Sequence, residues 1–185
     1  MPVRLRADPS AITIRGMYKA IVVGTDGSGT ASVAVQEATK LALLTGATLH
    51  VVHATHRRAP GVIAFAASGG MSELEAAEKN KEIVAESRQI CEQAATEARG
   101  LGVHVELHAV AGEAADALVA VAVDTGADLV VVGNRGMSGP RRFVLGSVPN
   151  TVSHHCPCSL LIVDTTSDHD HDAVAADATP ATVEG

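Results

Sequence analysis

The feature that most constrains the fold is an alternation of five short apolar runs with segments of helical pattern. Strands are expected at residues 19–24, 48–54, 103–110, 129–132 and 159–163, and helices at 30–45, 72–100, 113–125 and 147–155. Strands that alternate with helices at this spacing form parallel βαβ units with right-handed crossovers. Near-continuous apolar strands such as AIVV, LVVV and LLIV suit a sheet covered on both faces. The alternation therefore predicts an α/β protein with a single doubly wound, five-stranded parallel sheet and helices on both faces.

Composition narrows the kinds of protein that this chain can be. Its 185 residues suit one domain with extensions, and 46% of them are hydrophobic. The chain has no Trp, one Tyr and two Phe, so the core is expected to be aliphatic. The net charge of −7 argues against non-specific binding to nucleic acid. No apolar run reaches the roughly 18 residues of a membrane span, and no secretory signal is visible. These features predict a cytoplasmic protein without a nucleic-acid or membrane partner.

The two ends of the chain differ from the region between them. Residues 1–17 mix charged residues and prolines without periodicity and are expected as a flexible N-terminal extension, with Met17 open as an alternative start. Residues 165–185 are polar, acidic and rich in Ala and Thr, so they cannot bury enough apolar surface to offset the entropy of ordering. We therefore expect a folded domain over residues 18–164, followed by a disordered acidic tail.

Glycines are spaced in an unusual way in the stretch VVGNRGMSGPRRFVLGSVP, residues 131–149. Two residues separate Gly133 from Gly136, and nine more separate Gly136 from the pair Gly146-Ser147. In an open α/β sheet, ligands lie beyond the carboxyl ends of the strands, where the winding direction reverses. Glycines let the backbone approach a ligand closely, and the N–H groups at a helix start favour an anion. Three arginines within residues 135–142 add positive charge. The pattern predicts a ligand that carries phosphates, although it lacks the Lys of a P-loop.

Three segments together resemble the universal stress protein family. They are the spaced glycines, VVGTDGS at residues 22–28 and CPCSLLIV at residues 156–163. The resemblance covers residues 18–164, and Gly-x2-Gly-x9-Gly-Ser is the motif of the subgroup that binds ATP. It implies the adenine nucleotide alpha hydrolase-like fold with strand order 3-2-1-4-5, in which the first and fourth strands are neighbours. It also implies a stress-response sensor or regulator that binds ATP, with or without Mg²⁺.

The resemblance further implies roles for individual residues of a nucleotide site. Thr25 and Asp26 would touch the base and ribose, and Ala54 would line the adenine pocket. The glycines after the fourth strand would wrap the ribose and α-phosphate, and the start of the last helix would hold the outer phosphates. The complete expected set is Gly24, Thr25, Asp26, Ala54, Val132, Gly133, Arg135, Gly136, Gly146, Ser147 and Val148.

Two positions depart from the family pattern. Gly24 stands where ATP-binding members often have Pro or another larger residue, and Pro149 stands where a hydroxyl residue is common. Pro149 has no N–H to donate to a phosphate, although Pro is well tolerated in the first turn of a helix. The segments GTDGS and GSVP are together similar to those of family members associated with cyclic AMP. Cyclic AMP is therefore the alternative ligand.

The residues give little support for catalysis or for a metal site. No general base is evident near the glycines, and His154 and His155 lie well beyond Ser147 on the same predicted helix. Asp26 has an alternative role as a turn or cap residue after a strand. The cluster HHCPC has no second cluster at the spacing of a zinc site. We expect a binding module with no catalytic and no metal-binding residues, with slow ATP hydrolysis as the alternative.

The last predicted strand, residues 159–163, would lie at the edge of the sheet. An exposed apolar edge strand tends to aggregate unless it is covered or paired. The family resemblance implies that this strand pairs with its two-fold mate, so a homodimer is expected. A third interpretation makes the protein a nucleotide-gated subunit that binds a protein partner, which the residues do not name, with the loop of residues 55–70 as the surface that changes.

Overall fold

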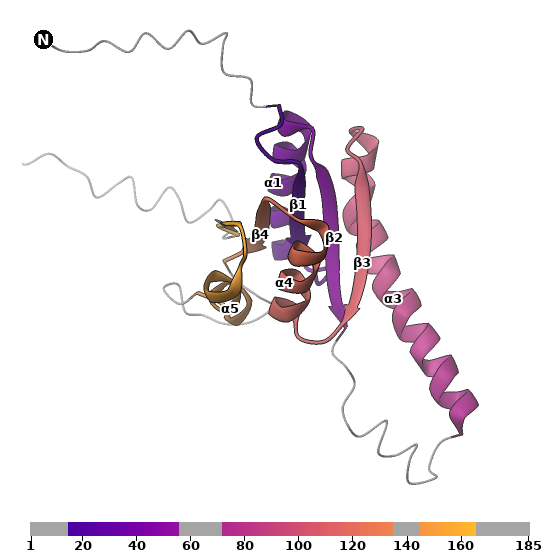
Figure 1. Cartoon of the computed structure of the whole chain (residues 1–185). Helices are drawn as coiled ribbons and strands as arrows, with labels where there is room; N and C mark the ends of the chain where they lie inside the picture. The colour runs from indigo at the N-terminus through magenta and orange to yellow at the C-terminus, as the bar shows by residue number, and fades with distance from the viewer. Residues whose placement is uncertain (1–14, 56–71, 135–144, 166–185) are drawn as a thin grey trace, which may run out of the picture.

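The computed structural model describes residues 15–55, 72–134 and 145–165, which form one five-stranded parallel sheet with helices on both faces (Figure 1). The strands are β1 (Ala20–Gly24), β2 (Thr48–Thr55), β3 (Val105–Ala111), β4 (Leu129–Gly133) and β5 (Ser159–Val163). The helices of the described residues are α1 (Gly29–Thr45), α3 (Glu73–Gly100), α4 (Ala114–Thr125) and α5 (Ser147–His155). The strand order β3-β2-β1-β4-β5 confirms the predicted topology.

The sheet separates two apolar layers because successive side chains of a strand point to opposite faces. In β1, Val23 packs in the layer formed with α1 and α3, whereas Val22 packs in the layer formed with α4 and α5. Both side chains are fully buried. Among the described residues, the buried hydrophobic side chains are Ala, Val, Leu, Ile, Cys and Pro149, and none is aromatic. The core is therefore aliphatic, as its composition predicts.

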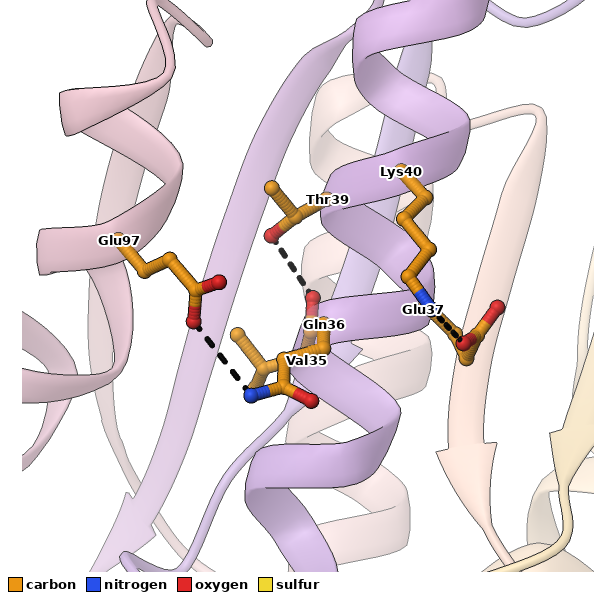
Figure 2. Close-up of polar contacts among 6 residues, drawn as sticks. All are labelled: Val35, Gln36, Glu37, Thr39, Lys40 and Glu97. Atoms are coloured by element: carbon orange, nitrogen blue, oxygen red, sulfur yellow. Dashed lines mark hydrogen bonds and ion pairs between the residues drawn. The ribbon is translucent and has the colours of Figure 1, made fainter.

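Apolar packing, with few polar links, holds α1 on the sheet beside α3 (Figure 2). Buried Thr39 satisfies its hydroxyl within the helix by donating to the carbonyl of Val35 at 2.8 Å. Gln36 Nε2 donates to Glu97 of α3 over a long 3.5 Å. Such an exposed polar contact contributes little to stability. The position of α1 is consequently set by its buried alanines.

The strand boundaries differ from the expected ones by one or two residues. Strand β3 begins at Val105 because the N–H of Val103 bonds to the carbonyl of Ala98, which closes the end of α3. Strand β2 extends to Thr55, which pairs with Ala111. The added pair Thr55–Ala111 lengthens the carboxyl edge of the sheet between β2 and β3.

Asn134 joins the carboxyl ends of β4 and β5. Its side-chain Nδ2 donates to Asp164 at 2.8 Å, and its Oδ1 accepts from the backbone N–H and the hydroxyl of Thr165 at 3.1 and 2.8 Å. Thr165 is buried, so the contacts of the sheet reach one residue beyond the predicted end of the folded domain. Residues 166–185, the rest of the predicted tail, lie outside the described part of the chain.

Candidate functional site

The loop after β1 is held by its own polar groups. Buried Thr25 continues the pairing of β1 because its N–H donates to the carbonyl of Val52 at 2.9 Å. The hydroxyl of Thr25 accepts from the N–H of Gly27 at 3.2 Å, and Gly27 has a φ of +79°, which favours glycine. Asp26 Oδ1 accepts from the N–H of Ser28 at 2.9 Å, and Ser28 caps α1. The turn role considered for Asp26 is thus present, and this bond uses one oxygen of its exposed carboxylate.

The ends of β1 and β4 lie side by side, because Val23 of β1 is in register with Val131 of β4. Gly24 comes directly after Val23, and Gly133 comes two residues after Val131. A Cβ atom at Gly24 would lie 3.3 Å from both terminal methyl carbons of Leu118 in α4. This distance is shorter than most carbon contacts, so glycine lets the end of β1 approach α4 closely.

A small cavity of about 140 Å³ opens beside these strand ends. It is lined by the loop after β1, the ends of β2 and β4, and the starts of α1, α4 and α5. Most of the residues predicted for a nucleotide site meet here, namely Gly24, Thr25, Asp26, Ala54, Val132, Gly133 and Val148. Leu118 and Pro149 contribute apolar surface to the same cavity.

A larger cleft of about 900 Å³ shares part of this lining and extends over the carboxyl edge of the sheet. Thr25, Asp26, Ala54 and Val148 line both spaces, and Ser147 lines the cleft. The sequence motifs do not predict the wall that α3 contributes through Ile83, Ser87 and Ile90. The sequence indicates this wall only through the spacing of these residues, four and then three positions, which places them on one helical face. A helix that packs on a core shows the same spacing, so the spacing does not identify a ligand site.

Carboxylates are prominent in the lining of the cleft. Asp26 is joined by Glu82 and Glu86 of α3 and by Glu113 and Asp116 at the start of α4. None of the described residues that line the cleft is Lys or Arg. This part of the cleft therefore does not neutralise a polyphosphate by itself. Positive charge for such a ligand has to come from a bound cation or from elsewhere in the chain.

His53 also lines the cleft, although no motif predicts it. Its Nδ1 lies 2.8 Å from the carbonyl oxygen of Thr25, which can only accept, so Nδ1 carries the proton. In the neutral ring Nε2 is then an acceptor. His53 consequently links the end of β2 to the loop after β1.

The start of α5 forms the remaining side. Gly146 is the N-cap, and its N–H donates to the carbonyl of Asn134 at 3.1 Å. Ser147 is exposed at the first helical position, and buried Pro149 follows within the first turn. The first N–H groups of a helix have no partner within it, and Pro149 has none to offer. Arg135 and Gly136, which belong to the predicted site, lie outside the described residues.

Two cysteines are poor nucleophiles. Burial raises the pKa of the Cys91 thiol. Burial and a hydrogen bond with Cys156 raise the pKa of Cys158 to about 12. A thiol attacks as its thiolate, so both side chains stay in the unreactive form near neutral pH.

The fold and the cleft define a doubly wound α/β protein with a ligand-sized cleft where the winding direction of the sheet reverses. The model of the universal stress protein family matches residues 17–164, and the chain belongs to this family. Universal stress protein Rv1636 of Mycobacterium tuberculosis is 36% identical over 150 residues, which cover 80% of this chain and 98% of that protein.

Solved structures have the same fold. A universal stress protein in complex with cAMP is 31% identical, with a TM-score of 0.57 over 80% of this chain and 98% of its own. The hypothetical protein MJ0577 is 26% identical, with a TM-score of 0.67 over 82% of this chain and 99% of its own. In the described part of this chain, every helix is too short or too polar to cross a membrane.

Proposed function

We propose that this protein binds an adenine nucleotide in the cleft beyond β1 and β4 and acts as a regulatory binding module of the cytoplasmic stress response. The observation that carries the proposal is the convergence of Thr25, Asp26, Ala54, Ser147 and Val148, from three separate segments, on one cleft. Membership of the universal stress protein family supports it. The relative crystallised with cAMP adds a ligand of the proposed class.

The lining offers complementary surfaces for the parts of such a ligand. Ala54, Val132 and Val148 form an apolar slot of the kind that suits a base. The carboxylate of Asp26 can accept from a ribose hydroxyl or an exocyclic amine. Ser147 and the start of α5 supply donors for one phosphate group. We place the base in the small cavity and the phosphate at α5.

ATP, with Mg²⁺, is the proposed ligand, because the spacing of Gly133, Gly136, Gly146 and Ser147 is that of the ATP-binding subgroup. Cyclic AMP is the second candidate, and the charge of the described lining supports it. Cyclic AMP has one negative charge, whereas ATP brings several into a space lined by carboxylates. Pro149 also removes one backbone donor from the first turn of α5.

Calorimetric titration with ATP, Mg²⁺-ATP, ADP, AMP and cyclic AMP separates these ligands. At about 1 mM protein, we expect measurable heat from at least one of them, since binding as weak as a millimolar Kd can then be measured. Ala54→Phe should abolish that heat by filling the slot. Leu101→Ala, at the opposite end of the sheet, is the matched control and should bind as wild type. Heat from none of the ligands would overturn the proposal, and preference for cyclic AMP would select the second candidate.

Turnover is expected to be negligible, because the described lining offers binding contacts but no residue placed to strengthen its contacts in a transition state. Single-turnover hydrolysis of labelled Mg²⁺-ATP should run well below about 1 s⁻¹, the low end of ordinary enzymes. Asp26→Ala should not change that rate. A faster rate that this substitution abolishes would favour the ATP hydrolase alternative and make Asp26 catalytic.

We also infer a homodimer that forms through β5. The strand pairs with β4 and ends the sheet, and its Leu161 is 36% exposed. Pairing of two such strands around a two-fold axis would cover both apolar edges.

A further inference from the structure

A group of ionisable side chains lies on the outer part of the sheet, apart from the nucleotide cleft. His50 of β2 stands in register with Glu106 of the edge strand β3, and Val52 stands in register with His108. Alternate residues of a strand point to the same face, so Glu106 and His108 project together beside His50. None of these three residues is among those that line the two cavities.

The ligand atoms of this group converge. His50 Nδ1 lies 3.1 Å from His108 Nε2 and 3.5 Å from Glu106 Oε2, and one atom from each residue falls within 4.8 Å of the others. A tetrahedral zinc ion with bonds of about 2.0–2.1 Å holds its ligand atoms about 3.3 Å apart. Two of the separations therefore match the edge of a zinc tetrahedron. The Glu106 side chain is 51% exposed and is free to adjust the third.

We propose that His50, Glu106 and His108 bind a divalent transition-metal cation, with Zn²⁺ the best match. Two imidazoles and one carboxylate are a ligand set that zinc accepts, and imidazole donors disfavour Mg²⁺ and Ca²⁺. Three protein ligands leave a fourth position for water. His104 is an alternative ligand for this fourth position. Its Nε2 lies 3.7 Å from Glu106 Oε1, and its side chain is 74% exposed.

The burial of the group suits a metal site. His50 is 5% exposed, which excludes water from one side, while half-buried His108 and exposed Glu106 leave an entry route. Burial also lowers the pKa of His50, an effect larger than the opposing charge of Glu106. A bound ion would join the edge strand β3 to β2. Since the unfolded chain does not hold these residues together, binding would raise the melting temperature.

The competing interpretation is a hydrogen-bonded histidine pair with a neighbouring carboxylate. The ring centroids of His50 and His108 are 5.3 Å apart, and one shared proton would satisfy the two facing nitrogens. Such a pair would gain nothing from zinc. Zinc binding by these residues, measured directly, therefore separates the two interpretations.

The test uses the full chain, treated with EDTA and dialysed. Residues 168–172 read DHDHD and can also chelate metals, so His169→Ala and His171→Ala are combined as the background. Titration with ZnCl₂ should give one site per chain in this background. Glu106→Gln and His108→Asn should each weaken it by more than about tenfold, since loss of even an outer-shell partner weakens metal sites by that much. His154→Asn is the control outside the group and should bind as the background does.

Further readouts keep the test independent of folding and of the nucleotide proposal. CoCl₂ should give the intense visible absorption of tetrahedral cobalt in the background and not in His108→Asn. Glu106 is exposed, so Glu106→Gln should retain the fold by circular dichroism and still lose the site. Nucleotide heats should be the same before and after EDTA treatment, measured without Mg²⁺. Failure of the background to bind zinc, or undiminished binding by both ligand variants, would overturn the proposal.

Discussion

At the scale of single residues, Gly24 connects packing with the predicted site. It lines the small cavity, and an added Cβ would press on Leu118 at 3.3 Å. We expect Gly24→Ala to lower the free energy of unfolding by about 1–3 kcal/mol, as overpacked positions do, and to weaken nucleotide binding. Urea unfolding measures the first effect. In a Leu118→Val background, where the shorter side chain reaches less far toward residue 24, the same substitution should cost less. An equal cost in both backgrounds would show that the contact with Leu118 does not set the preference for glycine.

Residues also show where reasoning from the sequence stops. The family resemblance implied Asp26, Ala54 and Val132 for the site, and the parallel sheet brings the strand ends beside these residues to one edge. His50 and His108 are 58 positions apart, and the register of β2 with β3 brings them together. The spacing of these two histidines along the chain does not indicate that they form a pair. The acidic wall on α3 likewise depends on how a distant helix packs.

At the scale of elements, the start of α3 depends on its cap. Glu75 accepts from the backbone N–H of Ser72 at 2.8 Å, and the Ser72 hydroxyl accepts from the N–H of Glu75 at 3.2 Å. Ser72 and Glu75 thus form a capping box, and their three-residue spacing in the sequence is typical of one. Among the α3 side chains that the structure describes, the first buried one is Ser87. The first turns extend past β3 (Figure 1), so local bonds have to hold them.

The cap predicts a pH-dependent end of α3. The N–H of Ser72, and then its hydroxyl, lower the pKa of Glu75 from 4.5. The ionised carboxylate therefore stabilises the turn above pH 4.5, and this contribution is lost as the pH falls through the lowered pKa. Cα chemical shifts of residues 73–76 should move toward coil values in acid. Glu75→Gln should weaken the turn at neutral pH and remove most of the titration. Helical shifts in the wild type that stay constant into strong acid would contradict this role.

At the scale of the whole molecule, the sheet has two unequal edges. The fold was predictable as a whole because five apolar runs in a βαβ pattern leave few topologies, and the observed order is among them. Edge β3 has alternating exposed residues and pairs closely with β2 beside α3. Edge β5 is the short apolar run SLLIV, of which Leu161 is exposed. Because of this asymmetry, β5 is the edge at which we expect association.

We predict that two chains pair through β5. Sedimentation velocity at about 100 µM should show a dimer, since a Kd of about 1 µM leaves little monomer at that concentration. Leu161→Lys should shift the protein to monomer, because it puts a charge into the apolar contact that the paired strands would bury. Val123→Lys changes a residue that is 61% exposed on α4, away from β5, and serves as the matched control that stays dimeric. A wild-type monomer at this concentration, or a dimer that Leu161→Lys leaves intact, would rule out association through this edge.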